Sequence, residues 1–435
     1  MSSKVSVCAA IVAAALAVGA CSSAATSNSR STAAPPVAST LIQSAQATPQ
    51  PAALTAAEIA RQTQDPSAAA QVRYKTGSTK KICQLTGDTD RELNEPTLNQ
   101  TYSRFGVSGT DLGSSFKYDG KLYLLFGDTV GAHGGKSIAF TRDTDPDNCL
   151  SLQFVTGPDG LYLPPTVPGI SLAPYDVPVS GFGAQGSMYV VFTTDWNAKE
   201  QKMGRSVLTR SRDNAQHFTY LYTLSTDKFI NVASVIVNNA DIRGLPATTG
   251  QGLLLWGSGY YRRSDPYLAY LPLNAVNDAK ALRYFAGTDG SGTPRWSTHE
   301  SAAVSLFSQP CLGELSVAWN SYLHKWLMLY NCTQPRGINF RTADSPWGPW
   351  SPTQVLFNPW TDGGYCHFMH VSYESQHCDS VSDPGQEDVW GGEYGPYMLP
   401  AFFTGSRNAT TLYFTMSTWN PYEVMLMKST LVIAP

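Results

Sequence analysis

The sequence carries little charge for its length. Of its 435 residues only 14% are Asp, Glu, Lys or Arg, and the formal net charge is −3. Proteins that bind nucleic acid or adhere to an anionic membrane surface usually carry a clear basic excess. The composition gives no electrostatic argument for either partner, and we expect no binding of nucleic acid.

Motifs that mark several enzyme classes are also missing. The sequence has no Gly-rich phosphate loop, no G-x-S-x-G nucleophile elbow and no H-E-x-x-H zinc motif. These absences argue against nucleotide-binding enzymes, α/β-hydrolases and zinc proteases. We expect the protein to use no metal and no cofactor.

Long apolar runs are scarce, and the N-terminus holds one. Lys4 precedes an apolar stretch over residues 5–18, which is too short for a convincing transmembrane helix and is typical of an export signal. The tetrapeptide VGAC, which ends at Cys21, resembles a bacterial lipobox. We therefore expect residues 1–20 to be a lipoprotein signal peptide and Cys21 to be lipidated at the outer face of the cell membrane. The alternative is ordinary cleavage near residues 24–25 and free secretion.

Residues 21–75 are rich in Ala, Ser, Thr, Pro and Gln. This composition predicts a flexible tether between the membrane and a folded domain over residues 76–435. We expect that domain to act as a monomer.

One pattern recurs five times in the folded part. Apolar runs typical of β-strands begin at residues 122, 188, 253, 326 and 412, and each follows a strand of small or apolar residues. Most precede a third strand, and no long amphipathic helix interrupts them. Repeated units of three or four strands predict an all-β fold, a five-bladed β-propeller. A two-sheet sandwich or two separate β-domains is the alternative.

The first unit contains a hairpin with an acid at each open end. Asp119-Gly120 lies between two runs of β-formers, which is a strong signal for a two-residue type I′ turn. Paired positions around that turn have residue numbers that add to 239, and this pairs Asp111 with Asp128. Their Cβ atoms would lie about 4.5–5.5 Å apart, where like charges repel. Either they form a coupled acid–base pair, or they are two exposed acids at strand ends.

Other acids and aromatic residues should meet this pair. In a propeller the first strand of each blade begins near the axis, so Glu314 of the fourth unit and Glu393, Tyr394 and Tyr397 of the fifth should converge there. Paired carboxylates in an aromatic-lined cleft are typical of glycoside hydrolysis. Aromatic residues near strand ends are either sugar platforms or ordinary packing residues; they are Trp196, Tyr260, Tyr261, Trp360, Trp390 and Trp419.

We also expect His370 and Asn420 to contact substrate, together with Glu314, Tyr397 and Trp419. His370 lies in a histidine-rich segment between Cys366 and Cys378. A zinc site there is conceivable, but a loop closed by a disulfide fits an exported chain better.

Six cysteines remain after export and lipidation, an even number that favours disulfides. Cys311 and Cys332 would face one another across a hairpin centred at residues 321–322. Cys366–Cys378 would close a short loop, and Cys83–Cys149 is the pair that remains.

Several motifs in order resemble one known family. They include ICQLTGDTDRELNEPTLNQTYSRFGVSGTDLGSSFKYDGKLYLLFGDT, GELSVAWNSYLHKWLMLYN, YCHFMH, YGPYMLP and LYFTMSTWNPYEVMLMKS. From about Lys80 to Leu431 the chain resembles the domain-of-unknown-function family 4185, part of which is classed as glycoside hydrolase family 183. The resemblance implies a five-bladed propeller with endo-D-arabinanase activity on arabinogalactan and lipoarabinomannan. It also implies inversion and two catalytic aspartates, Asp111 and Asp128.

Three functions follow as hypotheses. The first is an exported, lipid-anchored glycoside hydrolase that cleaves cell-wall D-arabinan, with Asp111 and Asp128 as acid and base. Glu314 is an alternative acid. The second is a propeller that binds polysaccharide or a protein without catalysis. The third is a glycosidase for L-arabinofuranosyl or galactofuranosyl chains.

Overall fold

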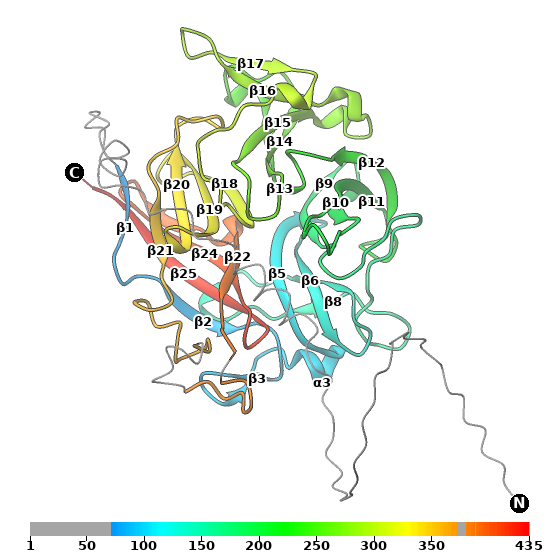
Figure 1. Ribbon diagram of the computed structural model, residues 1–435, viewed down its shortest axis with the longest axis vertical. Coiled ribbons are helices and arrows are strands. Elements are labelled where there is room, and N and C mark those ends of the chain that lie inside the picture. The colour runs from blue at the N-terminus through cyan, green and yellow to red at the C-terminus, as the bar shows by residue number, and fades with distance from the viewer. Residues whose placement is uncertain (1–70, 372–379, 388, 435) are drawn as a thin grey trace, which may run out of the picture. The chain divides into compact units, whose positions relative to one another are not determined.

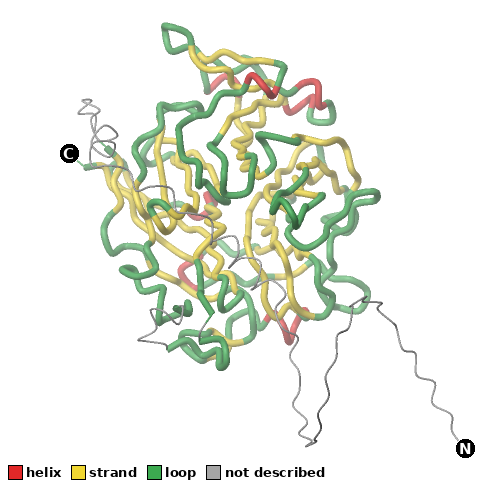
Figure 2. The backbone as a smooth tube through the Cα atoms, viewed as in Figure 1, coloured by secondary structure: helices red, strands yellow, loops and turns green. Residues whose placement is uncertain are grey.

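The computed structural model describes residues 71–371, 380–387 and 389–434. These residues are almost entirely β-strands and connecting loops (Figure 2). Single-turn 3₁₀ helices and one short α-helix, α3 (Thr101–Phe105), make up the helical part. None of the described helices has the length and apolar character needed to cross a membrane.

Five sheets account for nearly all the strands. The first has β5 (Val107–Tyr118), β6 (Lys121–Gly131), β7 (Lys136–Thr141) and β8 (Gln153–Phe154). The second has β9 (Pro178–Ala184), β10 (Ser187–Thr194), β11 (Arg205–Ser211) and β12 (Thr219–Ser225). The third has β13 (Asn231–Asn238), β14 (Gln251–Ser258), β15 (Tyr267–Pro272), β16 (Arg283–Thr288) and β17 (Pro294–Ser297).

The fourth sheet has β18 (Leu315–Asn320), β19 (Lys325–Thr333), β20 (Arg336–Ala343) and β21 (Gln354–Phe357). The fifth has β22 (Glu393–Met398), β23 (Thr404–Ser406), β24 (Ala409–Thr418) and β25 (Glu423–Ile433), with β1 (Val72–Tyr74) and β2 (Lys80–Gln84) added to β25. A separate small ribbon pairs β3 (Thr89–Asp90) with β4 (Glu95–Pro96).

The first strands of the five sheets close a ring. In order around it, β5 contacts β9, β9 contacts β13, β13 contacts β18, β18 contacts β22, and β22 returns to β5. Figure 1 shows these strands around the centre of the domain with the later strands of each sheet outside them. The predicted five-bladed β-propeller is therefore confirmed, with every predicted apolar run as the second strand of its blade.

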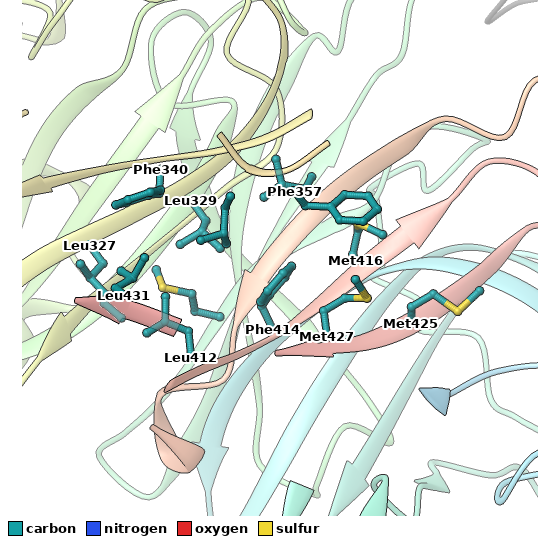
Figure 3. Close-up of a cluster of buried hydrophobic side chains, with 14 of the residues drawn as sticks. Leu327, Leu329, Phe340, Phe357, Leu412, Phe414, Met416, Met425, Met427 and Leu431 are labelled. Atoms are coloured by element: carbon teal, nitrogen blue, oxygen red, sulfur yellow. The ribbon is translucent and has the colours of Figure 1, made fainter. Parts of the chain in front are cut away.

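The hydrophobic core consists of layers between neighbouring blades. Along β6, Leu124 and Phe126 face the fifth sheet, whereas Tyr123 and Leu125 face the second. A strand covered on both faces must be apolar at every position, which explains the uninterrupted run LYLLF. Figure 3 shows one such layer, in which Leu329 and Phe340 of the fourth sheet meet Phe414 and Met427 of the fifth.

Ring closure corrects one predicted boundary. The segment expected to be a tether ends at residue 75, but β1 (Val72–Tyr74) already pairs with β25 near the C-terminus. Ordered sheet structure therefore begins at Val72. Residues 1–70, which include Cys21, lie outside the described residues.

Two of the expected disulfides are confirmed. Cys83–Cys149 has a Cα–Cα distance of 5.8 Å and Cys311–Cys332 one of 5.3 Å. The expected register of the second pair is wrong: Asn320 pairs with Lys325 around a longer turn, so β18 begins at Leu315 and Cys311 precedes it. Cys378 lies outside the described residues, so the Cys366–Cys378 pairing stays a prediction.

Candidate active site

The β5–β6 hairpin has the predicted turn. Tyr118 pairs with Lys121, and both Asp119 and Gly120 have positive φ values, 48° and 68°. The predicted register holds from there to Ser114 and Leu125. The type I′ assignment is therefore confirmed, and the open end of the hairpin lies at the start of β5.

The ladder is irregular where the two acids lie. Leu112 pairs with Phe126 and Thr110 pairs with Thr129, so Asp111 lies opposite the two residues Gly127 and Asp128. The direct Asp111–Asp128 pairing that we predicted is therefore replaced by a bulge. A Cβ atom on Gly127 would overlap Oδ1 of Asp111, so this position must be glycine for the Asp111 carboxyl to occupy its place.

Asp111 is buried and forms no ion pair with any of the described residues. The residue is only 9% exposed, and its Oδ2 accepts a hydrogen bond of 3.0 Å from the Tyr394 hydroxyl. Oδ1 has no hydrogen-bond partner among the described residues. Burial, followed by the charge of Asp128, raises the pKa of Asp111 to about 7, against the lowering effect of the Tyr422 and Tyr394 hydroxyls.

Asp128 lies in the opposite kind of environment. Its Oδ1 is 2.6 Å from Nζ of Lys136, and its Oδ2 accepts a hydrogen bond of 2.9 Å from the backbone N–H of Tyr175. Its side chain is 28% exposed, whereas that of Lys136 is 2% exposed. Lys136 Nζ also donates to the carbonyl oxygen of Ala173 at 2.8 Å. The two neighbouring aspartates thus differ in burial, charge and access to water.

A second charged pair reaches the same region from the third and fourth blades. The Glu314 carboxylate lies 3.3 Å from Nη2 of Arg262 and accepts a hydrogen bond of 3.2 Å from the Tyr261 hydroxyl. Arg262 has a positive φ of 53°, and its guanidinium lies over the rings of Tyr261 and Tyr394, at 4.8 and 5.5 Å. Glu314 is also among the charges that raise the pKa of Asp111, so it lies close to that carboxyl.

Sequence reasoning missed Arg262. The loop after β14, which contains Arg262, begins at the same end of its blade as the loop after β6. A basic residue in that loop could therefore have been predicted to lie near the two aspartates. Lys136 was also missed, although β7 follows the hairpin directly and pairs Lys136 with Asp128 of β6.

Aromatic residues surround the acids. Tyr394 and Tyr397 pack with Leu112, and Trp419 and Tyr422 pack against this cluster. The Tyr422 hydroxyl donates to the carbonyl oxygen of Asp128 at 3.1 Å. The structure therefore brings Asp111, Asp128, Glu314, Tyr397 and Trp419 into one region at the start of the inner strands.

Two residues that we expected to contact substrate, His370 and Asn420, make contacts within the protein instead. His370 is completely buried, with Nε2 3.8 Å from Asp383. The Asn420 side-chain amide donates to the carbonyl oxygens of Gln386 and Val389, at 2.9 and 2.7 Å. Both residues therefore support the loop before β22 and offer little surface to a ligand.

A cavity of about 1050 Å³ lies at the other end of the blades. It is lined by hairpin turns of the first three sheets, including Asp119, Gln185 and Gly250. Neither Asp111 nor Asp128 belongs to it. Within the described part of the chain, no group of three or more His, Cys, Asp or Glu is arranged to hold a metal ion.

The family model described as "Domain of unknown function (DUF4185)" matches residues 97–428. No curated protein matches the chain. Among solved structures, a GH43_1 enzyme from Xanthomonas citri is 14% identical with a TM-score of 0.40, covering 77% of this chain and 94% of that one. An exo-beta-1,3-galactanase from Phanerochaete chrysosporium is 12% identical with a TM-score of 0.43, covering 80% of this chain and 64% of that one. An alpha-L-arabinofuranosidase from Podospora anserina is 11% identical with a TM-score of 0.39, covering 75% and 91%.

Proposed function

The chain belongs to the DUF4185 family, and we propose that it is an endo-acting glycoside hydrolase that cleaves cell-wall D-arabinan. The observation that carries this proposal is the pair of neighbouring aspartates in contrasting surroundings, Asp111 buried and Asp128 ion-paired with Lys136. Hydrolysis of a glycosidic bond needs one carboxylic acid and one carboxylate, and such contrasting surroundings supply them. The choice of D-arabinan, as found in arabinogalactan and lipoarabinomannan, rests on the resemblance of the sequence motifs.

We assign Asp111 as the general acid and Asp128 as the general base. With a pKa raised to about 7, Asp111 keeps its proton in mildly acidic solution and donates it to the leaving glycosidic oxygen as the bond to the anomeric carbon breaks. Asp128 removes a proton from the water whose oxygen forms the new bond to that carbon. The products are two shorter chains with free hydroxyl groups, and both carboxyls then return to their starting states by exchange with solvent.

An inverting course is part of the proposal. Inversion needs room for a water molecule between the base and the sugar, with the two carboxyls about 6.5–9.5 Å apart. The 28% exposure of the Asp128 side chain gives water access to the base. Because the Glu314 carboxylate is held by Arg262 and Tyr261, we assign Glu314 to binding sugar hydroxyls and not to proton donation.

The test is product analysis on purified arabinogalactan. The wild-type protein should release arabinan oligosaccharides, and Asp111→Asn and Asp128→Asn should each reduce the rate by about 10²- to 10⁴-fold. Asp119→Asn is a matched control, because Asp119 is an exposed acid in the turn of the same hairpin and asparagine accepts its positive φ. Its rate should equal that of the wild type.

Two results would replace this proposal. Saturable binding of the polysaccharide without any product, equal in all four proteins, would identify a binding module. Release of products only from L-arabinofuranosyl or galactofuranosyl polymers would keep the hydrolase and change its substrate.

We also propose that the protein is exported and held at the outer face of the cell membrane by lipid on Cys21. The VGAC sequence and the two disulfides support this, because disulfides persist in oxidising compartments. A Cys21→Ser variant should move from the membrane fraction to the soluble fraction of cells. An unchanged distribution would exclude the anchor.

A further inference from the structure

A second aromatic cluster begins one residue away from the candidate active site. Glu393 is the first residue of the inner strand β22, and the next residue, Tyr394, donates to Asp111. Glu393 is buried, and its Oε2 lies 3.1 Å from Nη2 of Arg336, the first residue of β20. Because Tyr394 and Glu393 are neighbours in the chain, this part of β22 links Asp111 to Arg336 of the fourth blade.

Arg336 is fixed by rings as well as by charge. Its Nη2 donates to the Tyr365 hydroxyl at 2.5 Å, and its guanidinium lies over the ring of Trp390, 4.7 Å from the ring centroid. Nε1 of Trp390 donates to the same Tyr365 hydroxyl at 2.6 Å. These contacts hold Arg336, Tyr365 and Trp390 in one arrangement while 38% of the Arg336 side chain stays exposed.

Trp360 stands at the outer end of this cluster. Its ring lies edge-on to Tyr365, with 4.6 Å between ring centroids, and the residue is 53% exposed. The chain has ten tryptophans, all of them described, and only Trp360 and Trp319 are exposed. A single exposed apolar residue needs no explanation. An exposed indole that packs on a buried tyrosine is different when a partly exposed guanidinium contacts the same tyrosine ring, because the cluster offers a rigid apolar face together with hydrogen-bond donors.

That combination matches the chemistry of a sugar ring. The C–H face of a sugar packs on an indole, and its hydroxyl groups accept hydrogen bonds from a guanidinium. We propose that Trp360, Tyr365, Trp390 and Arg336 form a remote subsite, which binds one sugar unit of a polysaccharide chain whose cleaved bond lies at Asp111 and Asp128. This inference rests on the proposed function and adds to it a recognition site that favours long chains.

The test separates binding from hydrolysis by using the Asp111→Asn protein. Its affinity for D-arabinan oligosaccharides of four and of twelve units is measured by titration calorimetry. Adding Trp360→Ala should weaken binding of the twelve-unit chain by about 5- to 30-fold and leave the four-unit chain nearly unchanged. Trp319→Ala is the matched control, since Trp319 is the other exposed tryptophan and lies at the end of β18 away from Glu314. It should change neither affinity.

A kinetic measurement with Asp111 intact completes the test. Trp360→Ala should raise KM on arabinogalactan with little change in kcat, and Trp360→Phe should restore part of the loss because it keeps an aromatic face. Equal thermal unfolding midpoints of the variants would show that folding is unaffected.

The outcomes separate the two proposals. Equal binding of the long chain by the Trp360→Ala and Trp319→Ala proteins would overturn the remote subsite even if the wild type hydrolyses arabinan. Long-chain binding that depends on Trp360, together with a wild-type protein that releases no product, would support the subsite and overturn the hydrolase. No binding of either oligosaccharide by the Asp111→Asn protein would overturn the subsite.

Discussion

At the scale of single residues, Lys136 supplies the positive charge beside Asp128. A buried lysine is costly unless its charge is paired, and this one is paired with Asp128 and with the carbonyl oxygen of Ala173. The charge of Asp128 in turn helps to raise the pKa of Asp111, although burial raises it more. One buried cation therefore holds Asp128 near the buried Asp111, as the proposed acid–base pair requires.

The raised pKa of Asp111 predicts that kcat/KM falls at alkaline pH. The alkaline limb should fall near pH 7, as Asp111 loses the proton that it must donate. In Lys136→Met the side chain of Asp128 loses the ammonium group that holds its Oδ1, so the maximal rate should fall by about tenfold or more. The profile is measured as initial rates on arabinogalactan from pH 4 to 9.

Lys136→Arg, which keeps the positive charge, is the control and should retain most of the wild-type rate. A Lys136→Met rate equal to that of the wild type would show that the ion pair does not position Asp128. That result would contradict the assignment of Asp128 as the base.

At the scale of single elements, β25 begins with a buried acid that the proposed chemistry does not use. Glu423 Oε2 accepts a hydrogen bond of 2.6 Å from Thr86, and its other oxygen packs against Gly87, where no side chain would fit. Burial raises the pKa of Glu423 to about 8. Glu423 therefore holds the segment after β2 against the start of β25 in its protonated form.

The stability of the fold should then depend on the pH. Because the pKa is raised on folding, the folded chain binds the proton more tightly than the unfolded chain, whose ordinary value is 4.5. This contribution is complete below about pH 4.5 and is lost as the pH rises through about 8. In Glu423→Gln that loss should disappear, a difference on the order of 4 kcal/mol at most between pH 5 and pH 8.5.

Urea unfolding of the wild type and of Glu423→Gln at the two pH values measures this effect. Glu95→Gln in the neighbouring strand β4 is the control, because Glu95 is exposed. If the wild type and Glu423→Gln lose stability equally between pH 5 and pH 8.5, Glu423 is not the group responsible.

The elements also show how far local sequence patterns reach. The turn at Asp119-Gly120 was predictable because two residues with positive φ determine a type I′ hairpin. The bulge at Asp111 was not, since the backbone there also bonds to Ser417 of the fifth blade. The Ser417 hydroxyl accepts a hydrogen bond from the backbone N–H of Leu112 at 2.7 Å and donates one to the carbonyl oxygen of Leu112 at 3.5 Å. The predicted register of the β18–β19 hairpin was wrong by two residues. The four-residue loop that joins these strands lacks the strong sequence signal of a two-residue turn.

At the scale of the whole molecule, the propeller is closed by both ends of the described chain. β1 and β2 add to β25, so the fifth sheet contains strands from residues 72–84 and 393–433. The Cys83–Cys149 disulfide then joins β2 of this sheet to the segment between β7 and β8 of the first. Figure 1 shows the early strands β1 and β2 beside the late strands β24 and β25. The ring is thus held at its junction by hydrogen bonds and by a covalent link.

This closure also determines what the site can contain. Asp111 comes from the first blade, Arg262 from the third, Glu314 from the fourth and Tyr394 from the fifth. No short sequence motif contains site residues from two of these blades. They meet because five twisted sheets pack face to face around one axis, with their first strands innermost.

The sequence by itself determined the local structure: five units of strands, the type I′ turn and the proximity of Asp111 to Asp128. Each of these depends on neighbouring residues, through alternating burial and backbone preference. Only the tertiary structure decided that Asp111 is buried against Tyr394, that Lys136 pairs with Asp128, and that Arg336 and Trp360 both pack on Tyr365. Burial and charge at one position depend on every segment that packs there. Those segments can be far apart in the sequence, as are Asp111 and Tyr394, whose sequence separation is 283 residues.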